Sequence, residues 1–403
     1  MIKPGQHQIN EWAQSLSVET QERLNSAVKD LCTVKERGGK IVVVTGSGPN
    51  IHEGVTTLLA ELIRTGLIDG VTTSSAVVAH EMAGVLDKVK RVDGKALGMP
   101  HSQLPRGDIF EFSVLDANDF DRIAEDFPLD RDLLARGDAI EGEVIIKAAG
   151  NMAYPMGLWT EQMADRIRQK AQAEAQPFEK IAGMSADERT MLGQGARRDV
   201  PVLVTIPQLV GGGNVGLAVG DSIPISRRSR LIADLLGSAD MIIESGVALT
   251  QEIHDGPFET YTGHGIWAEW QGQDVYRLEK KKLIRIDLDP ALDSAWKFER
   301  ESHTVQQAID KGLPKTKIME IPFRMEMSGF ARLEGSLPII GDIGVVWPII
   351  ALRMQERLGV ELEFISAPQQ TPEGQLMRDW IVENIRPIKP LRDLAPATAS
   401  PVA

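Results

Sequence analysis

The chain has 403 residues, of which 42% are hydrophobic and 25% are charged, and its formal net charge at pH 7 is −13. This length and composition suffice for the hydrophobic cores of one or two globular domains. The acidic balance argues against nucleic acid or an anionic membrane as a partner, because both bind to basic surfaces. The single cysteine, Cys32, excludes a disulfide within the chain and fits a reducing compartment.

The first residues, Met1 to Trp12, are polar and lack the apolar segment of a secretory signal. No run reaches the ~18 apolar residues that a membrane span requires. These two observations predict a cytoplasmic protein.

Strand and helix signals alternate along most of the chain. Residues 1–38 predict a helical arm that ends at two glycines. Residues 40–48 (KIVVVTGSG) are a β-branched apolar run bounded by glycine, which is typical of a buried parallel strand. The other expected elements, in chain order, are helix 55–65, strand 69–75, helix 77–86, strand 144–147, helices within 157–198, strand 202–206, helix 226–237, strands 241–246, 283–290 and 337–342, and helix 345–358.

This alternation predicts an α/β fold with a doubly wound, mostly parallel, Rossmann-like sheet. No clean linker interrupts residues 39–365, so we expect one nucleotide-binding domain there, with a helical insert at about 151–198. The stretch 90–140 is expected to add to the same sheet. Residues 366–403 predict a C-terminal helix followed by a proline-rich tail.

The first candidate site follows the first predicted strand, because ligands of a parallel sheet bind beyond the carboxyl ends of its strands. The glycines of Thr45-Gly46-Ser47-Gly48-Pro49-Asn50 allow a ligand to approach the backbone, and the helix after Gly54 offers free N–H groups to a phosphate. The spacing matches neither the dinucleotide fingerprint G-x-G-x-x-G nor a P-loop. The segment predicts phosphate or ribose binding by Gly46, Ser47, Gly48 and Asn50, and an ordinary strand-to-helix turn is the alternative.

Two more segments follow predicted strands. Thr73, Ser74 and Ser75 can bind a nucleotide through their hydroxyls or cap the next helix. The glycine-rich segment 211–216 predicts either a loop that closes over a ligand or a loop that is only mobile.

Carboxylates stand at two further strand ends. Asp287 and Asp289 can accept hydrogen bonds from ribose hydroxyls, or they can cap the helix that begins at Pro290. Gly341 and Asp342 precede an apolar helix whose N-terminus is expected to face the crevice. Asp342 is therefore a candidate cofactor ligand and catalytic group, or a helix cap.

Three other side chains are candidates for catalysis. Glu244 ends a predicted strand, and the segment that contains His254 follows it, so both are candidate acid–base groups. Lys147 ends an apolar strand, where partial desolvation suits a lysine to amine or imine chemistry. The alternative for Lys147 is an amine that extends to the rim of the sheet.

Four histidines stand in loops or helices near predicted strand ends: His52, His80, His254 and His264. No two of them have the H-x-x-x-H spacing of a helical metal site. We therefore expect no metal.

Several of these segments resemble the NAD-binding sheet of deoxyhypusine synthase. The run from Thr45 to Gly54, its helix and the run from Thr72 to Glu81 follow that enzyme's order. There, a Thr-Ser-Asn strand end and a Ser-Ser-Gly helix start precede a Thr-Thr-Ala-Gly-Gly turn with acidic residues after it. No counterpart of that enzyme's catalytic lysine segment is evident.

The chain resembles more closely the archaeal and cyanobacterial ornithine cyclodeaminases of the same fold type, formerly labelled lysine-oxoglutarate reductase/saccharopine dehydrogenase (LOR/SDH) domains. The shared motifs, in the same order, are Val43–Gly46, Ala60–Ile63, Ala239–Met241, Ile286–Pro290 and Gly341–Gly344.

This resemblance implies a deoxyhypusine-synthase type of fold, NAD as the cofactor and a homo-oligomer, either a dimer or a tetramer. It also implies a redox-neutral lyase that acts on a small amine or amino acid. In such enzymes a hydride leaves the amine-bearing carbon, an imine forms, and the hydride later returns. Two alternatives stay open: an alkylamine transferase like deoxyhypusine synthase, and a non-catalytic sensor that binds a nucleotide.

Overall fold

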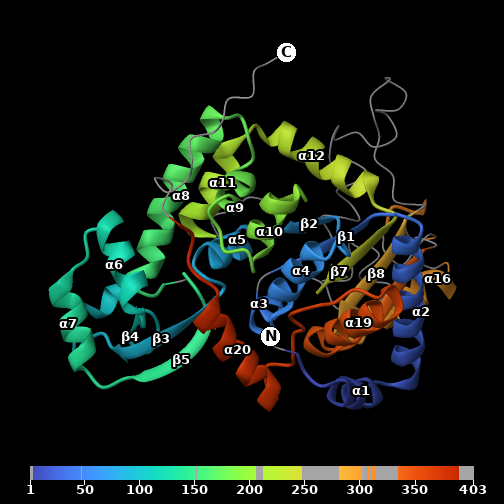
Figure 1. Ribbon diagram of the computed structural model, residues 1–403, viewed down its shortest axis with the longest axis horizontal. Helices are drawn as coiled ribbons and strands as arrows, with labels where there is room; N and C mark the ends of the chain where they lie inside the picture. The colour runs from blue at the N-terminus through green and yellow to red at the C-terminus, as the bar shows by residue number, and fades with distance from the viewer. Residues whose placement is uncertain are drawn as a thin grey trace.

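The computed structural model describes residues 3–46, 48–150, 152–205, 212–246, 281–301, 303, 307, 310–313 and 335–389. Its main feature is a sheet of six parallel strands in the order β6-β2-β1-β7-β8-β9 (Figure 1). The strands are β1 (Ile41–Thr45), β2 (Gly70–Thr73), β6 (Val202–Val204), β7 (Met241–Ser245), β8 (Lys282–Asp287) and β9 (Ser336–Ile340). The predicted α/β, Rossmann-like fold class is confirmed.

The strands of this sheet are almost continuously apolar because helices cover both of its faces. Alternate residues of each strand enter different cores: Val43 and Ile243 lie in the larger core, and Val42 and Ile242 lie in the smaller one. The smaller core is completed by α12 (Ile225–Ser238) and α16 (Ala291–Glu301). The larger core includes α2 (Val18–Glu36), α4 (Val55–Arg64), α5 (Ser75–Met82), α8 (Met156–Ala173), α9 (Phe178–Gly183), α10 (Met191–Arg198), α11 (Gly213–Ser222) and α19 (Ile343–Leu358).

Residues 86–148 form a second sheet, which is a correction to the expectation that they extend the first. β3 (Leu86–Asp93) lies between β4 (Ile109–Ser113) and β5 (Glu143–Ala148), and both pairs are antiparallel. The apolar run at 144–147 was therefore assigned to the wrong sheet, because periodicity does not show which strand a segment pairs with. α6 (Ala117–Asp126) and α7 (Arg131–Ala139) accompany this sheet (Figure 1).

Helices at both ends of the described chain pack onto these sheets. α1 (Gln6–Ser15) and α2 replace the single helix expected over 10–38, and both contact α19. α20 (Pro372–Asn384) packs against β3 and lies between the two sheets (Figure 1). No described helix is both long and apolar enough to cross a membrane.

Among the described strands, none pairs with the outer side of the edge strand β6, and a buried ion pair binds its backbone there. Glu179 accepts a hydrogen bond from the Val204 backbone N–H (2.6 Å), and Arg228 donates to the Val204 carbonyl oxygen (3.2 Å). Glu179 and Arg228 also bind each other, and both side chains are fully buried. Glu179 thus occupies the guanidinium of Arg228.

This pair generates a stability prediction. Glu179→Ala is expected to lower the free energy of unfolding by about 3–5 kcal/mol, because it leaves the Arg228 charge buried and unpaired. Glu188→Ala is the matched control, since the Glu188 side chain is 60% exposed and lies 4.0 Å from Arg197; its effect should stay within about 0.5 kcal/mol. Denaturant unfolding measures both, and equal losses for the two variants would contradict the assignment.

Candidate functional site

The order of the strands reverses between β1 and β7. The chain passes from β1 to β2 and β6 on one side, and then from β7 to β8 and β9 on the other. In sheets of this type the connections diverge at such a switch point, and nucleotides bind in the crevice beyond the carboxyl ends of the two central strands. The structure thus defines a Rossmann-like α/β protein whose candidate site lies at the β1–β7 switch point.

A network of buried side chains forms the base of this crevice. The Asn50 amide donates to the Ser245 carbonyl oxygen (3.1 Å), and the Ser245 hydroxyl donates to Asn50 Oδ1. Trp347 Nε1 then donates to the Ser245 hydroxyl (2.8 Å). Asn50, predicted to bind the cofactor, thus joins the segment after β1 to the last residue of β7 and retains only part of its hydrogen-bonding capacity for a ligand.

The helix start after β1 differs from the expected one. A four-residue helix, α3 (Pro49–His52), follows Gly48, and Gly48 has the positive φ of 67° that favours glycine. A Cβ at Gly48 would meet nothing within 4 Å, so a ligand can approach this backbone. Gly54 is different, because a Cβ there would lie 2.5 Å from Met377 Sδ. Gly54 therefore packs closely against Met377, and the expectation that the helix after it offers N–H groups to a phosphate stays a prediction.

Gly46 directly follows β1, and Ser47 lies outside the described residues. The glycine segment 211–216 is described only from Gly212 onward, where Gly213 begins α11. His254 also lies outside the described residues.

Buried hydroxyl groups without partners stand at the ends of three neighbouring strands. Thr45 and Thr73 are the last residues of β1 and β2, and Thr205 directly follows β6. Within the described part of the chain, none of the three Oγ1 atoms has a hydrogen-bond partner. A buried hydroxyl without a partner costs free energy, so this edge of the sheet fits a ligand that supplies polar groups.

The remaining hydroxyls after β2 have structural roles or buried positions. Ser74 caps α5 by accepting a hydrogen bond from the Val77 N–H (3.4 Å), which is the capping alternative stated for this segment. Ser75 is fully buried at the start of the same helix.

The carboxylates after β8 and β9 also form caps. Asp287 Oδ1 accepts from the Asp289 N–H (2.8 Å), and Asp289 Oδ1 accepts from the Ala291 N–H (2.9 Å) at the start of α16. Asp342 caps α19 through the Gly344 N–H (2.8 Å). For Asp289 and Asp342, this is the capping alternative stated in the sequence analysis.

Gly341 lies in a tightly packed environment. Its N–H donates to the Asp287 carbonyl oxygen (2.8 Å), which continues the β8–β9 pairing. A Cβ at Gly341 would lie 2.9 Å from Val346 and 3.5 Å from Leu16. Close packing within the fold thus accounts for this glycine.

Glu53 is a group at this edge that our sequence analysis missed. It follows α3 and is buried; its Oε2 accepts from the Gln369 N–H (2.6 Å). A Cβ at Gly344 would lie 2.3 Å from the same oxygen, so only glycine admits the carboxylate at the start of α19. Burial, and secondarily the charge of Asp342, raise the pKa of Glu53 to about 7. The signal available in the sequence was the pair of adjacent titratable residues His52 and Glu53, which lies between Gly48 and Gly54.

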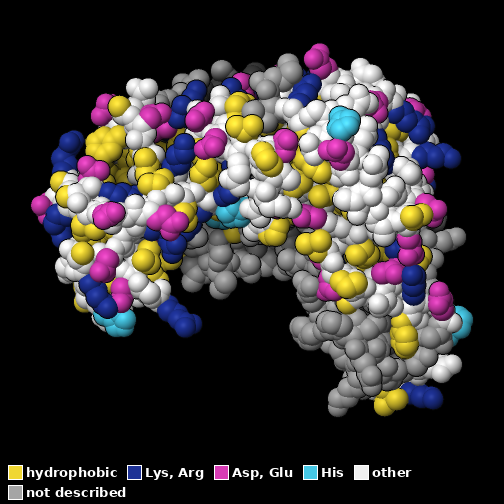
Figure 2. Space-filling model, turned by 90° about the horizontal axis from the view of Figure 1, so that it is seen from below, with side chains coloured by type: hydrophobic (Ala, Val, Ile, Leu, Met, Phe, Trp, Pro, Cys, Tyr) yellow, Lys and Arg dark blue, Asp and Glu magenta, His cyan; other side chains and the backbone are white. Residues whose placement is uncertain are grey.

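His52, the neighbour of Glu53, lies near basic side chains from three other elements. Burial, together with the charges of Arg378 and Lys147, lowers the pKa of His52. Burial and the charge of Lys147 lower the pKa of His80, whose Nδ1 lies 2.7 Å from the Ala149 carbonyl oxygen. These groups come from α3, α5, β5 and α20, so the second sheet contributes to the site. Figure 2 shows the second sheet and its helices as a limb that projects beside the rest of the molecule.

The structure places two predicted catalytic residues in ion pairs. Lys147 Nζ lies 2.7 Å from Glu111 Oε2, across the second sheet. Glu244 Oε2 lies 2.8 Å from Arg285 Nε, and both side chains are buried on the main sheet. Of the two, only Lys147 lies beside the histidines. Among the described residues, no group of three or more His, Cys, Asp or Glu side chains is arranged to hold a metal.

Comparison with known proteins was made by sequence and by structure. No family model and no curated protein matches the chain. A cyanobacterial arginine dihydrolase, ArgZ, superposes with a TM-score of 0.39 and 13% identity over 85% of this chain. AgrE in its ternary complex with ornithine and NAD+ superposes with a TM-score of 0.40 and 14% identity, also over 85%. The chain spans about a third of the length of both proteins, 32% and 34% respectively.

A LOR/SDH protein from Methanococcus maripaludis superposes with a TM-score of 0.36 and 14% identity, over 89% of this chain and 71% of that protein. These proteins are of the kind that the sequence motifs resemble. The chain is similar to them in fold.

The buried carboxylates generate a pH prediction. Burial raises the pKa values of Glu53, Glu81 and Asp87 to about 7. A carboxylate whose folded-state pKa is raised contributes stability that is present below the unfolded pKa and is lost as the pH rises through the folded pKa. The free energy of unfolding should therefore fall between about pH 4.5 and pH 7.5.

Denaturant titrations across that pH range measure this slope. Glu53→Gln mimics the protonated group and should make the decline shallower. Glu356→Gln, a change of a partly exposed residue on α19, should leave it unchanged. A free energy of unfolding that rises steadily over this range would contradict the burial of these groups.

Proposed function

We propose that the chain is an NAD-dependent enzyme that carries out a redox-neutral reaction on a small amine or amino acid. The observation that carries this proposal is the crevice at the β1–β7 switch point, with its unpartnered threonine hydroxyls at the strand ends. The similarity in sequence motifs to the ornithine cyclodeaminases supports the choice of NAD and of the reaction class. The ornithine and NAD+ in the AgrE complex are consistent with it.

In this proposal the cofactor lies along the strand ends of the main sheet. Because Gly46 and Gly48 have no side chains, the cofactor can lie close to the protein backbone there. Thr73 and Asn50 form hydrogen bonds to it. Asp287 and Asp289 stand at the carboxyl end of β8, where an acidic side chain accepts hydrogen bonds from ribose hydroxyls. NAD, when bound, accepts a hydride from the amine-bearing carbon of the substrate and later returns it.

The substrate binds between the two sheets in this proposal. Arg378 and Lys147 provide positive charge for a carboxylate, and His52 and His80 are neutral near pH 7 because their pKa values are lowered. Lys147 serves the imine step, in which the substrate nitrogen gains and loses protons. Both Glu244 and Lys147 are ion-paired, but Glu244 is fully buried, whereas Lys147 is partly exposed and lies near the two histidines. The proposal therefore relies on Lys147 for this chemistry.

Cofactor binding is the first test. NAD should bind to the purified chain in a calorimetric titration, and Thr73→Val should weaken binding by about 0.5–1.5 kcal/mol, because a hydroxyl hydrogen bond is lost. Thr72→Val is the matched control: Thr72 is also buried in β2 with an unpartnered hydroxyl, but its side chain points to the other face of the sheet. Absence of NAD binding at millimolar concentration would remove the cofactor from the proposal.

Isotopic labelling tests the reaction. A substrate with deuterium at the amine-bearing carbon should return the label to the product carbon, with catalytic NAD and no net NADH. Stoichiometric release of NADH would instead indicate an ordinary dehydrogenase. Loss of the label to water, with NAD dispensable, would indicate a lyase that works by proton abstraction.

Replacement of Lys147 tests its role. Lys147→Met keeps the apolar stem and removes the amine, so the chemical step should slow much more than NAD binding weakens. Lys88→Met in β3 is the matched control, since Lys88 lies on the opposite face of the second sheet and pairs with Asp379 at 3.6 Å. Equal rates for both variants would exclude Lys147 from the chemistry.

A further inference from the structure

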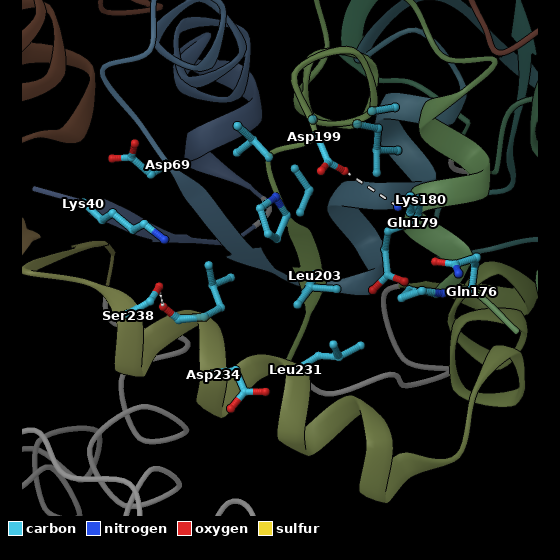
Figure 3. A pocket seen from close by; sticks show the side chains of 18 of the residues that line it. Lys40, Asp69, Gln176, Glu179, Lys180, Asp199, Leu203, Leu231, Asp234 and Ser238 are labelled. Atoms are coloured by element: carbon cyan, nitrogen blue, oxygen red, sulfur yellow. Dashed lines mark hydrogen bonds and ion pairs between the residues drawn. The ribbon is translucent and has the colours of Figure 1, made fainter. Parts of the chain in front are cut away.

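An apolar cavity lies at the opposite end of the main sheet from the switch-point crevice. Lys40, Asp69 and Pro201, which line it, directly precede β1, β2 and β6. The cavity has a volume of about 350 Å³ and is enclosed by α9, α10, α12 and the edge strand β6 (Figure 3). A ligand at the carboxyl ends of β1 and β7 therefore does not occupy it.

The interior of this cavity is mainly apolar. Leu203 projects from β6 into its centre, and Leu231 faces Leu203 from α12 (Figure 3). Leu192 and Leu235 complete the apolar lining from α10 and α12. The cavity thus accommodates an apolar side chain, whose burial is favourable.

The backbone N–H and carbonyl groups of one residue in the edge strand β6, Val202, are open to hydrogen bonding from this cavity. Strand β6 pairs with β2 through residues 201, 203 and 205, as the bonds from Val71 N to Pro201 O (2.9 Å) and from Thr205 N to Thr73 O (3.1 Å) show. The peptide groups of Val202 and Val204 therefore point outward. Glu179 and Arg228 satisfy those of Val204, whereas no described residue bonds the N–H or carbonyl of Val202, which lines the cavity.

Charges of both signs surround the apolar interior. Lys180 and Asp199 stand on the same side of the cavity, 3.7 Å apart and largely exposed, and Asp234 stands on the other side (Figure 3). Lys40 extends toward the cavity from the start of β1. Asp69 cannot neutralise Lys40, because it binds Lys35 Nζ at 2.8 Å. The charged residues at the rim of the cavity can therefore bind both the cationic and the anionic group of one small molecule.

We propose that this cavity is a second small-molecule site, which binds an apolar α-amino acid. The side chain of the ligand lies between Leu203 and Leu231. Its carboxylate accepts a hydrogen bond from the Val202 N–H, and its ammonium group donates to the Val202 carbonyl oxygen, as a neighbouring strand does. Small-molecule sites have volumes of about 300–1,000 Å³, so this cavity suits a ligand the size of leucine or phenylalanine.

Calorimetric titration with L-leucine and with isocaproate tests this site. Isocaproate has the same carbon skeleton without the amine, so it should bind at least about tenfold more weakly, because the hydrogen bond to the Val202 carbonyl and the charge contact are lost. In spectra of chain labelled with ¹⁵N-valine, leucine should shift the Val202 amide signal. Equal binding of both probes, or no saturable binding of leucine at about 10 mM, would overturn the proposal.

Substitutions of Leu231 test whether leucine binds in this cavity. Leu231→Trp fills the cavity and should abolish leucine binding, whereas Leu217→Trp, on an exposed position of α11 outside the cavity, should leave it unchanged. Leu231→Ala removes apolar contacts without adding bulk, and should weaken binding if the tryptophan variant does not fold. Thr73→Val, which tests the cofactor site, should not change the affinity for leucine. The two proposals can therefore be confirmed or contradicted independently. Unchanged leucine affinity in both folded Leu231 variants would contradict the assignment.

Discussion

The reversal of strand order between β1 and β7 is the constraint on which the rest of the site depends. A chain that winds outward in both directions from the centre of a parallel sheet cannot cross over its own switch point, so the carboxyl ends of β1 and β7 stay accessible. The Asn50–Ser245–Trp347 network closes the base of this crevice and joins two loops that are far apart in sequence. The position of every proposed cofactor group follows from this arrangement.

Buried glutamates secure the elements around that crevice. Glu81 accepts from the N–H groups of Met191 and Leu192 at the start of α10, Glu53 accepts from Gln369, and Glu179 accepts from the edge strand β6. A buried carboxylate is costly unless hydrogen bonds or a cation compensate it. The raised pKa values of Glu53 and Glu81 show that compensation is partial, and only Glu179 has a buried arginine as partner. Glu53 differs from the other two because it lies near the charge of Arg378 on α20.

Much of the fold could be predicted from the sequence, because apolar β-branched runs such as 41–45 and 241–245 carry a strong strand signal. Pairing could not be predicted in the same way: Val144–Lys147 has the same apolar character, yet it pairs antiparallel with β3. Periodicity reports how a segment is buried, and pairing depends on tertiary contacts.

The site could be predicted less completely. Polar residues at strand ends identified Thr73 and Asn50, but caps and packing account for Ser74, Asp289 and Gly341 equally well. Arg378 stands in a helix far along the chain, so nothing in its local sequence places it beside His52.

The central claim is that the β1–β7 switch point holds NAD. A crystal structure of the chain with NAD measures this directly. The account predicts electron density for the dinucleotide across the carboxyl ends of β1 and β7, with a hydrogen bond to Thr73 or Asn50. Density for the dinucleotide at the amino edge of the sheet, or a switch point that stays empty in crystals grown with saturating NAD, would contradict it.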